Sequence, residues 1–322
     1  MTGGRARPRV ALVATGGTIA SRREADGASR PSLGGDSLLD ALGDTGLAIE
    51  PVDLMAKDSS SLTAADMQAV STKVGALLAD PDLAGVVVLH GTDAMEETAL
   101  LVQLQNQPAR PVVFTGAQFT ADHPEADGPG NLAAALRLAG GLVGREDAAG
   151  RGVLLAFGGR VLPAWSLYKR SADAPDAFRQ SLPQDNPREA ALPGDVGALR
   201  VDIVAIHPGC DGALVEASLA AGADGIVLAA LGSGNATPAV VEAVGRAQAR
   251  GVPVVVSSRV PEGRLVASYG GGGGGHDLAG AGAIHSAELR PGQARILLLA
   301  HLAAGTPRDA LRAAFAARVK SA

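Results

Sequence analysis

The sequence of 322 residues is poor in several features that mark whole classes of protein. It has one cysteine, Cys210, so an internal disulfide is excluded and a reducing compartment, the cytoplasm, is the expected location. Aromatic residues make up 2% of the chain, so its core must be aliphatic. The N-terminal apolar run, Val10 to Ala14, is shorter than the about 7–15 residues of a secretory signal. No segment approaches the ~18 consecutive apolar residues that indicate a membrane span.

The chain also lacks a large excess of charge of one sign and lacks metal-binding motifs. The net charge is −5, and no basic run or basic amphipathic face is present, so we expect neither a nucleic-acid partner nor a membrane surface. The six histidines show no metal-ligand spacing, so no metal is predicted. The first predicted strand is not followed by G-x-G-x-x-G, and no G-x-S-x-G elbow occurs. We therefore expect no cofactor and no serine hydrolase of the α/β-hydrolase type.

Short apolar runs alternate with stretches of helical period along the whole chain, which favours an α/β fold with parallel sheets flanked by helices. The length suits two domains, and a stretch rich in Pro, Asp and Ala separates them. We assign residues 1–180 to a larger, flavodoxin- or Rossmann-like catalytic domain, 181–199 to a linker, and 200–322 to a smaller α/β domain. The predicted strands are Val10–Ala14, Leu47–Val52, Val86–Leu89, Val112–Phe114, Val153–Phe157, Val201–Ile206, Gly225–Ala230 and Val254–Ser257. The predicted helices are Thr63–Leu78, Met95–Gln107, Gly130–Gly144, Leu214–Ala221 and Pro238–Arg250.

Two predicted strands end in small-residue turns that carry a threonine. Thr15 follows the first strand and precedes Gly16-Gly17, while Thr92 and Asp93 follow the strand Val86–Leu89. Ligands of parallel α/β sheets bind outside the carboxyl ends of the strands, so both loops could face one cleft. Asp93 also stands where a helix begins, where backbone N–H groups favour anions. A plain strand-ending turn at Thr15 and a helix cap at Asp93 remain the alternatives.

Lysine is rare in this arginine-rich chain, and the third candidate is a lysine. Arg keeps its proton near neutral pH, whereas Lys can release one in a suitable environment. Lys169 follows the strand Val153–Phe157; beside Asp93 it could keep that carboxylate ionised, and a partly neutral Lys could take a proton from a threonine hydroxyl. An ordinary surface lysine is the alternative. The four lysines are Lys57, Lys73, Lys169 and Lys320.

Two further loops offer polar groups at strand ends. Asp58 and Ser59 follow one strand, and Ala117 with Asp127-Gly128 follows the strand Val112–Phe114. Both loops are suited to binding a ligand, although either could be an ordinary surface loop.

These segments, taken together, resemble the bacterial-type L-asparaginase/glutaminase family. ATGGTIAS (14–21) and HGTDAMEETA (90–99) are similar to the two signature segments of that family almost letter for letter. Further similar segments follow in the family's order: DSS (58–60), TGAQ (115–118), ADGPGNL (126–132), VLPAWSLYKRS (161–171), GSGN (232–235), SSRVPEG (257–263) and LRPGQARILL (289–298). The resemblance covers nearly the whole chain.

The resemblance implies a role for each matching residue. It implies an enzyme that hydrolyses L-asparagine to L-aspartate and ammonia, in which Thr15 is the nucleophile. It implies that Thr92 is the second catalytic threonine and that Asp93 and Lys169 form its proton relay. Gly91 in the same turn and Asp58 beside Ser59 would line the substrate site. Ser59 would hold the α-carboxylate of the substrate, Asp93 its α-ammonium group, Ala117 its amide through the carbonyl, and Asn235 would come from a neighbouring subunit. The family's assembly implies a homo-oligomer, a dimer or a tetramer.

Three departures from the family pattern concern the rim of the site. The lid that follows the first signature, residues 22–35, has no tyrosine, and Ala28 stands in its place. A glutamate that the family takes from the neighbour falls in the glycine run 270–275, and Phe119-Thr120 replaces Arg-Pro after TGAQ. Two alternatives to an asparaginase therefore stay open. One is a glutaminase or another small-amide amidase; the other is a non-catalytic amino-acid-binding module, which would bind asparagine without releasing ammonia.

Overall fold

The computed structural model describes residues 6–23, 29–31, 39, 42–142 and 148–318. The chain divides into two compact units, the first formed by Met1–Arg179 with Asp185–Ala191 and the second by Gln180–Gln184 with Leu192–Ala322. The segment expected to be a linker is thus shared between the two units. Within the first unit, the buried amide of Asn186 accepts a hydrogen bond from Trp165 N and donates to the carbonyls of Arg151 and Val153. This part of the segment is therefore packed structure.

The first unit contains a six-stranded sheet among the described residues, in the order β4-β1-β5-β6-β7-β8. The pairs from β4 to β7 are parallel, whereas β8 turns back and pairs antiparallel with β7. The sheet is therefore mostly, not wholly, parallel. Its strands are β1 (Arg9–Ala14), β4 (Ala48–Asp53), β5 (Leu83–Leu89), β6 (Val112–Thr115), β7 (Val153–Phe157) and β8 (Arg160–Pro163).

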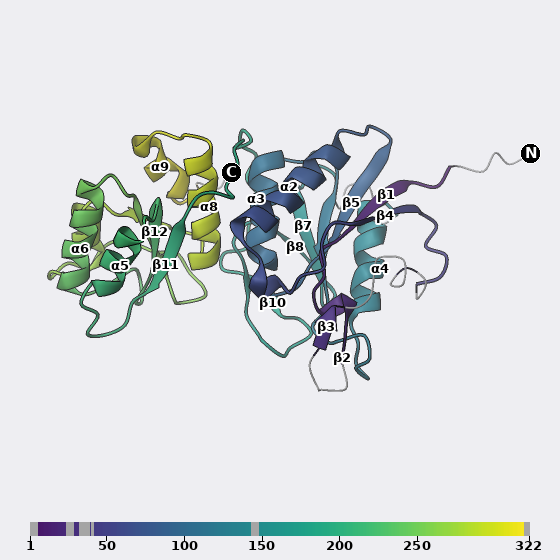
Figure 1. Ribbon diagram of the computed structural model, residues 1–322, viewed down its shortest axis with the longest axis horizontal. Coiled ribbons are helices and arrows are strands. Elements are labelled where there is room, and N and C mark those ends of the chain that lie inside the picture. Colours follow the sequence, from purple (N-terminus) through teal and green to yellow (C-terminus); the bar gives the residue numbers. More distant parts are fainter. Residues whose placement is uncertain (1–5, 24–28, 32–38, 40–41, 143–147, 319–322) are drawn as a thin grey trace, which may run out of the picture. The chain divides into compact units, whose positions relative to one another are not determined.

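Helices cover both faces of this sheet (Figure 1). Helices α2 (Ala64–Leu78) and α3 (Met95–Asn106) lie on one face, and α4 (Gly128–Ala139) lies on the other. Helix α2 begins with a capping box in which the side chains of Thr63 and Asp66 each bind the other residue's backbone N–H. The predicted helix over 130–144 is wrong at both ends, because α4 begins two residues earlier and ends at Ala139.

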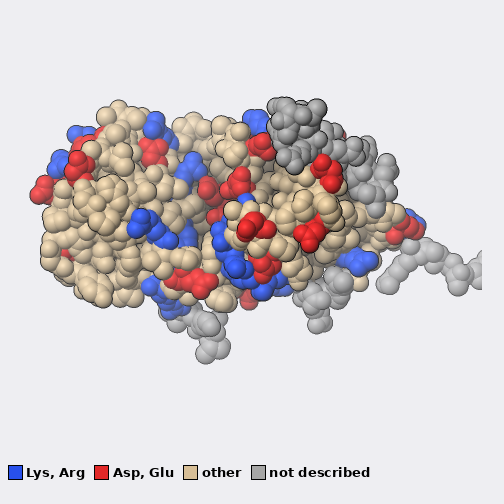
Figure 2. Space-filling model, turned by 90° about the horizontal axis from the view of Figure 1, so that it is seen from below, with Lys and Arg blue, Asp and Glu red and all other residues tan. Residues whose placement is uncertain are grey.

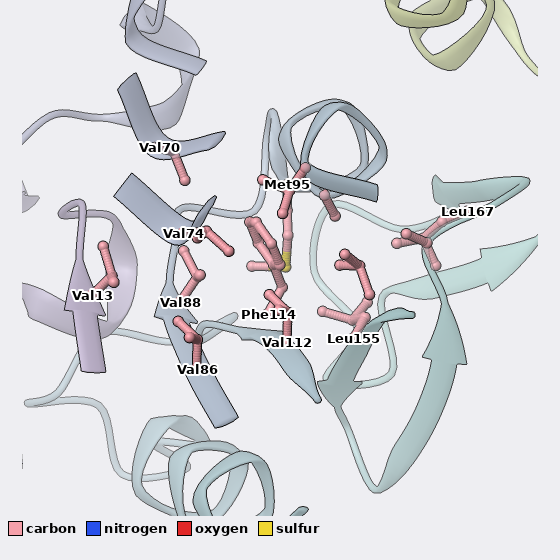
Figure 3. Packing of buried hydrophobic residues seen from close by; sticks show 14 of the residues in the cluster. Val13, Val70, Val74, Val86, Val88, Met95, Val112, Phe114, Leu155 and Leu167 are labelled. Atoms are coloured by element: carbon pink, nitrogen blue, oxygen red, sulfur yellow. The ribbon is translucent and has the colours of Figure 1, made fainter. Parts of the chain in front are cut away.

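Alternate residues of each central strand enter opposite cores, as the twofold period of a strand requires. Val86, Val88 and Phe114 pack against α2 and α3, whereas Val87 and Val113 pack against α4. Figure 3 shows the first of these cores, where Met95 of α3 and Leu167 lie around Phe114 and Leu155. Nearly all side chains in both cores are aliphatic, as the composition predicts.

Short elements lie around the sheet of the first unit. A hairpin pairs β2 (Ser21–Arg23) with β3 (Ser29–Pro31), and Ala28, which we expected in place of a lid tyrosine, lies outside the described residues. β9 (Leu167–Lys169) and β10 (Phe178–Gln180) form a two-stranded sheet. The 3-10 helices η1 (Thr18–Ala20) and η2 (Ser59–Ser61) follow β1 and β4.

The second unit repeats the α/β plan on a smaller scale. Its parallel four-stranded sheet has the order β11-β12-β13-β14, and α8 packs on the face opposite α5 and α6. The predicted helices in this unit are confirmed to within one residue, while α7, α8, α9 and β14 are elements that we did not predict. Its elements are β11 (Val201–Ala205), α5 (Ala213–Ala220), β12 (Gly225–Ala230), α6 (Pro238–Ala249), β13 (Val254–Ser258), α7 (Gly275–Gly280), β14 (Ile284–His285), α8 (Pro291–Ala303) and α9 (Arg308–Phe315).

Surface charge is mixed in sign. On the face shown in Figure 2, Lys and Arg side chains lie among Asp and Glu side chains. Ion pairs among the described surface residues include Arg9 with Glu50 at 2.7 Å and Arg200 with Asp202 at 3.0 Å. None of the helices that the structure describes has the length and apolar character needed to cross a membrane.

Candidate active site

The first candidate loop follows β1. The parallel register of β1 and β5 sets Ala14 beside Leu89, so the two strands end together. Thr15 is the next residue and is buried, and both its backbone N–H and its hydroxyl donate to the carbonyl of Leu89, at 3.1 and 2.8 Å. The side chain is thereby held in one orientation at the carboxyl edge of the sheet.

Two glycines let the β1 loop approach the β5 loop closely. Gly17 has a φ of +86°, and a Cβ there would lie 2.5 Å from the Cα of Gly91. A Cβ on Gly91 would in turn lie 2.5 Å from the Oγ of Ser59. Neither position can carry a side chain without moving backbone or the serine. Glycine at both places brings the loops after β1, β4 and β5 into one contact region.

The β5 loop leads into α3, and Asp93 does not cap that helix. The N-cap residue is Ala94, and the backbone N–H of Asp93 donates to the Oγ of Ser59 at 3.0 Å. The Asp93 side chain is 60% exposed, although it is engaged in an ion pair, so its carboxylate can reach a ligand in solution. Of the two open alternatives for Asp93, the helix cap is therefore excluded.

Lys169 joins the two groups of the β5 loop. From the end of β9, its Nζ donates to the Oγ1 of Thr92 at 2.8 Å and to the Oδ1 of Asp93 at 2.7 Å. Its side chain is 20% exposed, and the Thr92 side chain is buried. A charge-assisted hydrogen bond of this length is stronger than one between neutral groups. Lys169 is thus bonded to both groups of the β5 loop and is not a freely solvated lysine.

Glu96 is a contact that the sequence did not indicate. It stands in the first turn of α3. Its Oε2 accepts a hydrogen bond from the backbone N–H of Lys169 at 2.6 Å. Burial, with the negative charge of Glu97 next to it, raises the pKa of Glu96 to about 8, although its bond to Lys169 lowers it. The pattern M-E-E after a turn does not distinguish Glu96 from Glu97.

His90, the first residue after β5, is fully buried. Burial lowers the pKa of His90 to about 4, so the ring is neutral at physiological pH. Its Nδ1 lies 2.7 Å from the carbonyl oxygen of Gly91 and, as the neutral ring's donor, holds that carbonyl in place. Its Nε2 has no hydrogen-bond partner within the described parts of the chain. His90 therefore supports the backbone of the loop.

The loop after β6 is held by Asp127 and Asn131. The Asp127 carboxylate accepts from the backbone N–H groups of Gln118 and Phe119 and from the Asn131 amide, all at 2.9–3.0 Å. Asn131 also donates to the carbonyl of Gly116 at 3.1 Å. Between these anchors lies Ala117, which is buried. Asp127 was predicted to belong to a functional loop, and the structure gives it the task of shaping that loop.

The sequence candidates fall into two groups. The first unit brings together Thr15, Gly91, Thr92, Asp93, Lys169 and Ser59 through the contacts above, and the Ala117 loop joins them because His90 N donates to Thr115 O at 2.9 Å. Asp58 is exposed at the start of η2, next to Ser59. Asn235 belongs to the second unit, where its Oδ1 accepts a hydrogen bond from Gly275 N at 3.1 Å. Across the described residues, no three His, Cys, Asp or Glu side chains are arranged to hold a metal ion.

Comparison with known proteins gives one answer for both units. A family described as "Asparaginase, N-terminal" matches residues 9–188, and one described as "Glutaminase/Asparaginase C-terminal domain" matches residues 200–315. A probable L-asparaginase of Deinococcus radiodurans is 35% identical, over 96% of this chain and 97% of that protein. A probable periplasmic L-asparaginase of Haemophilus influenzae is 30% identical, over 90% of this chain and 87% of that protein. The crystal structure of a probable cytoplasmic L-asparaginase from Campylobacter jejuni matches with a TM-score of 0.84 and 28% identity, covering 96% of this chain and 99% of that one.

The two-unit α/β fold and these matches define a hydrolase that acts on amide bonds. Both matched regions together cover most of the chain, in the order that the fold displays. The chain belongs to the asparaginase family.

Proposed function

We propose that this protein is an L-asparaginase, which hydrolyses L-asparagine to L-aspartate and ammonia. The observation that carries the proposal is the position of the Lys169 amine, 2.8 Å from the Thr92 hydroxyl and 2.7 Å from the Asp93 carboxylate, in the loop region that also holds Thr15. A lysine held between a hydroxyl and a carboxylate can pass a proton to or from that hydroxyl. The names of these three relatives, each a probable L-asparaginase, support the choice of substrate.

In the proposed reaction, Thr15 Oγ1 attacks the side-chain carboxamide carbon of asparagine. The C–N bond then breaks, the nitrogen leaves as ammonia with the proton of the Thr15 hydroxyl, and an acyl ester with Thr15 remains. A water molecule attacks the ester and restores the threonine, releasing aspartate. Backbone N–H groups near Thr15 and Thr92 would stabilise the oxyanion, which is typically worth ~3 kcal/mol per donor. For the attack, the Thr15 hydroxyl must leave its hydrogen bond to the Leu89 carbonyl.

The amino-acid end of the substrate would bind to groups that are already oriented. Ser59 Oγ accepts from Asp93 N, so its own hydroxyl hydrogen can donate to the substrate α-carboxylate. The exposed Asp93 carboxylate would bind the α-ammonium group, and the Ala117 carbonyl the amide N–H. Gly91 and Asp58 would line this end. Asn235 would reach the site of a second copy of the chain, in a homodimer or homotetramer.

The cytoplasm is the proposed location. The sequence contains a single cysteine, and a solved relative is described as cytoplasmic, although another relative is described as periplasmic. Fractionation of the source cells, with activity and antibody detection in each fraction, tests this; recovery in an extracytoplasmic fraction would contradict it.

An ammonia-release assay tests the function. Purified wild-type protein should release one ammonia per asparagine hydrolysed, whereas Thr15→Ala should lose about 10³-fold or more of kcat. Thr72→Ala, a change on the exposed side of α2, serves as the matched control and should stay at the wild-type rate. Parallel assays on glutamine separate an asparaginase from a glutaminase. Binding of asparagine without release of ammonia would identify the protein as a binding module and contradict the proposed asparaginase activity.

A further inference from the structure

The partly buried carboxyl of Glu96 connects the two elements that carry the relay groups. Helix α3 follows directly on Thr92 and Asp93, and β9 ends at Lys169. Both elements are anchored in the same core, α3 through Met95 and β9 through Leu167 (Figure 3). Glu96 follows Met95 in the chain, and its Oε2 reaches across to the backbone N–H of Lys169 at 2.6 Å.

Lys169 is therefore held at both ends by one short segment of chain. Its amine binds Thr92 and Asp93, while its backbone N–H binds Glu96, three residues beyond Asp93. A lysine side chain has four rotatable bonds and loses much rotamer freedom when its amine is fixed. Fixing the backbone of Lys169 as well reduces the range of positions that its amine can occupy. Without that bond, β9 could slide relative to α3, and Nζ would leave the position between its two partners.

We propose that Glu96 is a positioning residue of the relay, which sets the place of the Lys169 amine by holding the Lys169 backbone. The inference rests on the proposed function and adds a residue to it. In this scheme Glu96 acts through Lys169 and touches neither substrate nor Thr15.

The charges around Glu96 decide which substitution mimics it. The charged groups that face it are Glu97 on its own helix, Asp93 in the preceding loop, and Lys169 on β9. With its pKa raised to about 8, the Glu96 carboxyl carries a proton at pH 7. Glutamine then reproduces its shape, its charge and its acceptor oxygen. Methionine keeps the length of the side chain and removes the acceptor.

The test compares kcat and KM for asparagine at pH 7 in Glu96→Gln, Glu96→Met and the matched control Glu97→Met. Glu96→Met should lower kcat by about tenfold to a hundredfold, the loss expected when a reacting group is displaced by about 1 Å, and change KM by less than about threefold. Glu96→Gln and Glu97→Met should stay within about threefold of wild type. In a Lys169→Met background, Glu96→Met should cause no further loss, because the group it positions is gone.

Several outcomes would overturn the proposal. Wild-type kcat in Glu96→Met would remove the role, and a loss in Glu96→Gln equal to that in Glu96→Met would show that the acceptor geometry is not what matters. An equal loss in Glu97→Met would assign the effect to helix-start carboxylates in general, and a further loss in the double variant would place Glu96 outside the relay. Thermal melting of each variant identifies a folding defect, in which case Glu96→Gln still decides. Failure of the proposed function is distinct, because the wild-type protein itself would then release no ammonia.

Discussion

The pKa of Glu96 predicts how stability responds to pH when this residue is changed to glutamine. Glu96 has its pKa raised from 4.5 to about 8 in the folded protein, so the folded state binds more protons than the unfolded state between these values. Its contribution is fully present below pH 4.5 and is lost as pH rises through about 8. Glutamine does not titrate, so Glu96→Gln lacks this loss.

The size of the effect follows from the shift. At about 1.4 kcal/mol per pKa unit, the shift corresponds to about 5 kcal/mol, and because the side chain keeps some exposure to water we take about 3–5 kcal/mol. For a unit of this size, 1 kcal/mol moves the melting temperature by about 2–4 °C. Relative to wild type, Glu96→Gln should therefore gain roughly 6–20 °C between pH 4.5 and pH 8.5.

Scanning calorimetry of wild type, Glu96→Gln and the control Glu242→Gln, a change at an exposed position of α6, measures this difference at several pH values from 4.5 to 8.5. His90 contributes a slope of the opposite sign to wild type and variant alike. Its pKa is lowered from 6.5 to about 4, so its contribution is present above pH 6.5 and is lost as pH falls through about 4. The comparison between variants removes it. A difference in melting temperature between wild type and Glu96→Gln that stays constant over the whole pH range would refute the reasoning.

Three further predictions concern the loops of the site. Lys169→Met should abolish most turnover, while the Kd of aspartate, measured by calorimetry, should stay within about tenfold of wild type; Lys73→Met is the control. Lys169→Arg should not restore turnover, because a guanidinium keeps its proton at pH 7. An active Lys169→Arg variant would show that Lys169 serves only as a fixed positive charge. Asp127→Ala leaves the N–H groups of Gln118 and Phe119 without their acceptor and should lower kcat/KM for asparagine by about tenfold or more. Asp122→Ala in the same loop is the control. Unchanged kinetics in Asp127→Ala would show that substrate binding does not depend on the shape of this loop. Gly17→Ala should lower both activity and melting temperature, because its Cβ would lie 2.5 Å from the Gly91 Cα at a positive φ. Gly43→Ala, also at a positive φ but with open space around it, should lower the melting temperature alone. Normal activity in Gly17→Ala would mean that the close approach of the two loops is not needed for activity.

Local patterns in the sequence were sufficient to predict most elements that carry the site. Continuous apolar runs identified β1, β5, β6 and β7 because a strand buried on both faces has no polar side. The helices predicted to begin at Thr63 and Pro238 have these starts because Thr63 and Thr237 cap α2 and α6, and a side-chain cap depends on a backbone N–H three residues further on. The same logic placed Thr15 and Thr92 at strand ends. Helix α8 was missed because it is buried on most sides and so lacks an amphipathic period.

Contacts between distant residues were decided by the tertiary structure. Nothing within the sequence window around Lys169 shows that its amine meets Thr92 and Asp93, which lie 77 and 76 positions away. The antiparallel return of β8 and the two-stranded β9–β10 sheet deliver Lys169 to that place. Glu96 and Glu97 are the same residue type in the same helical turn, and burial against β9 gives one of them a protonated carboxyl and a bond to Lys169. The physical reason is that desolvation and charge proximity depend on what packs against a side chain, and neither is a property of the local sequence.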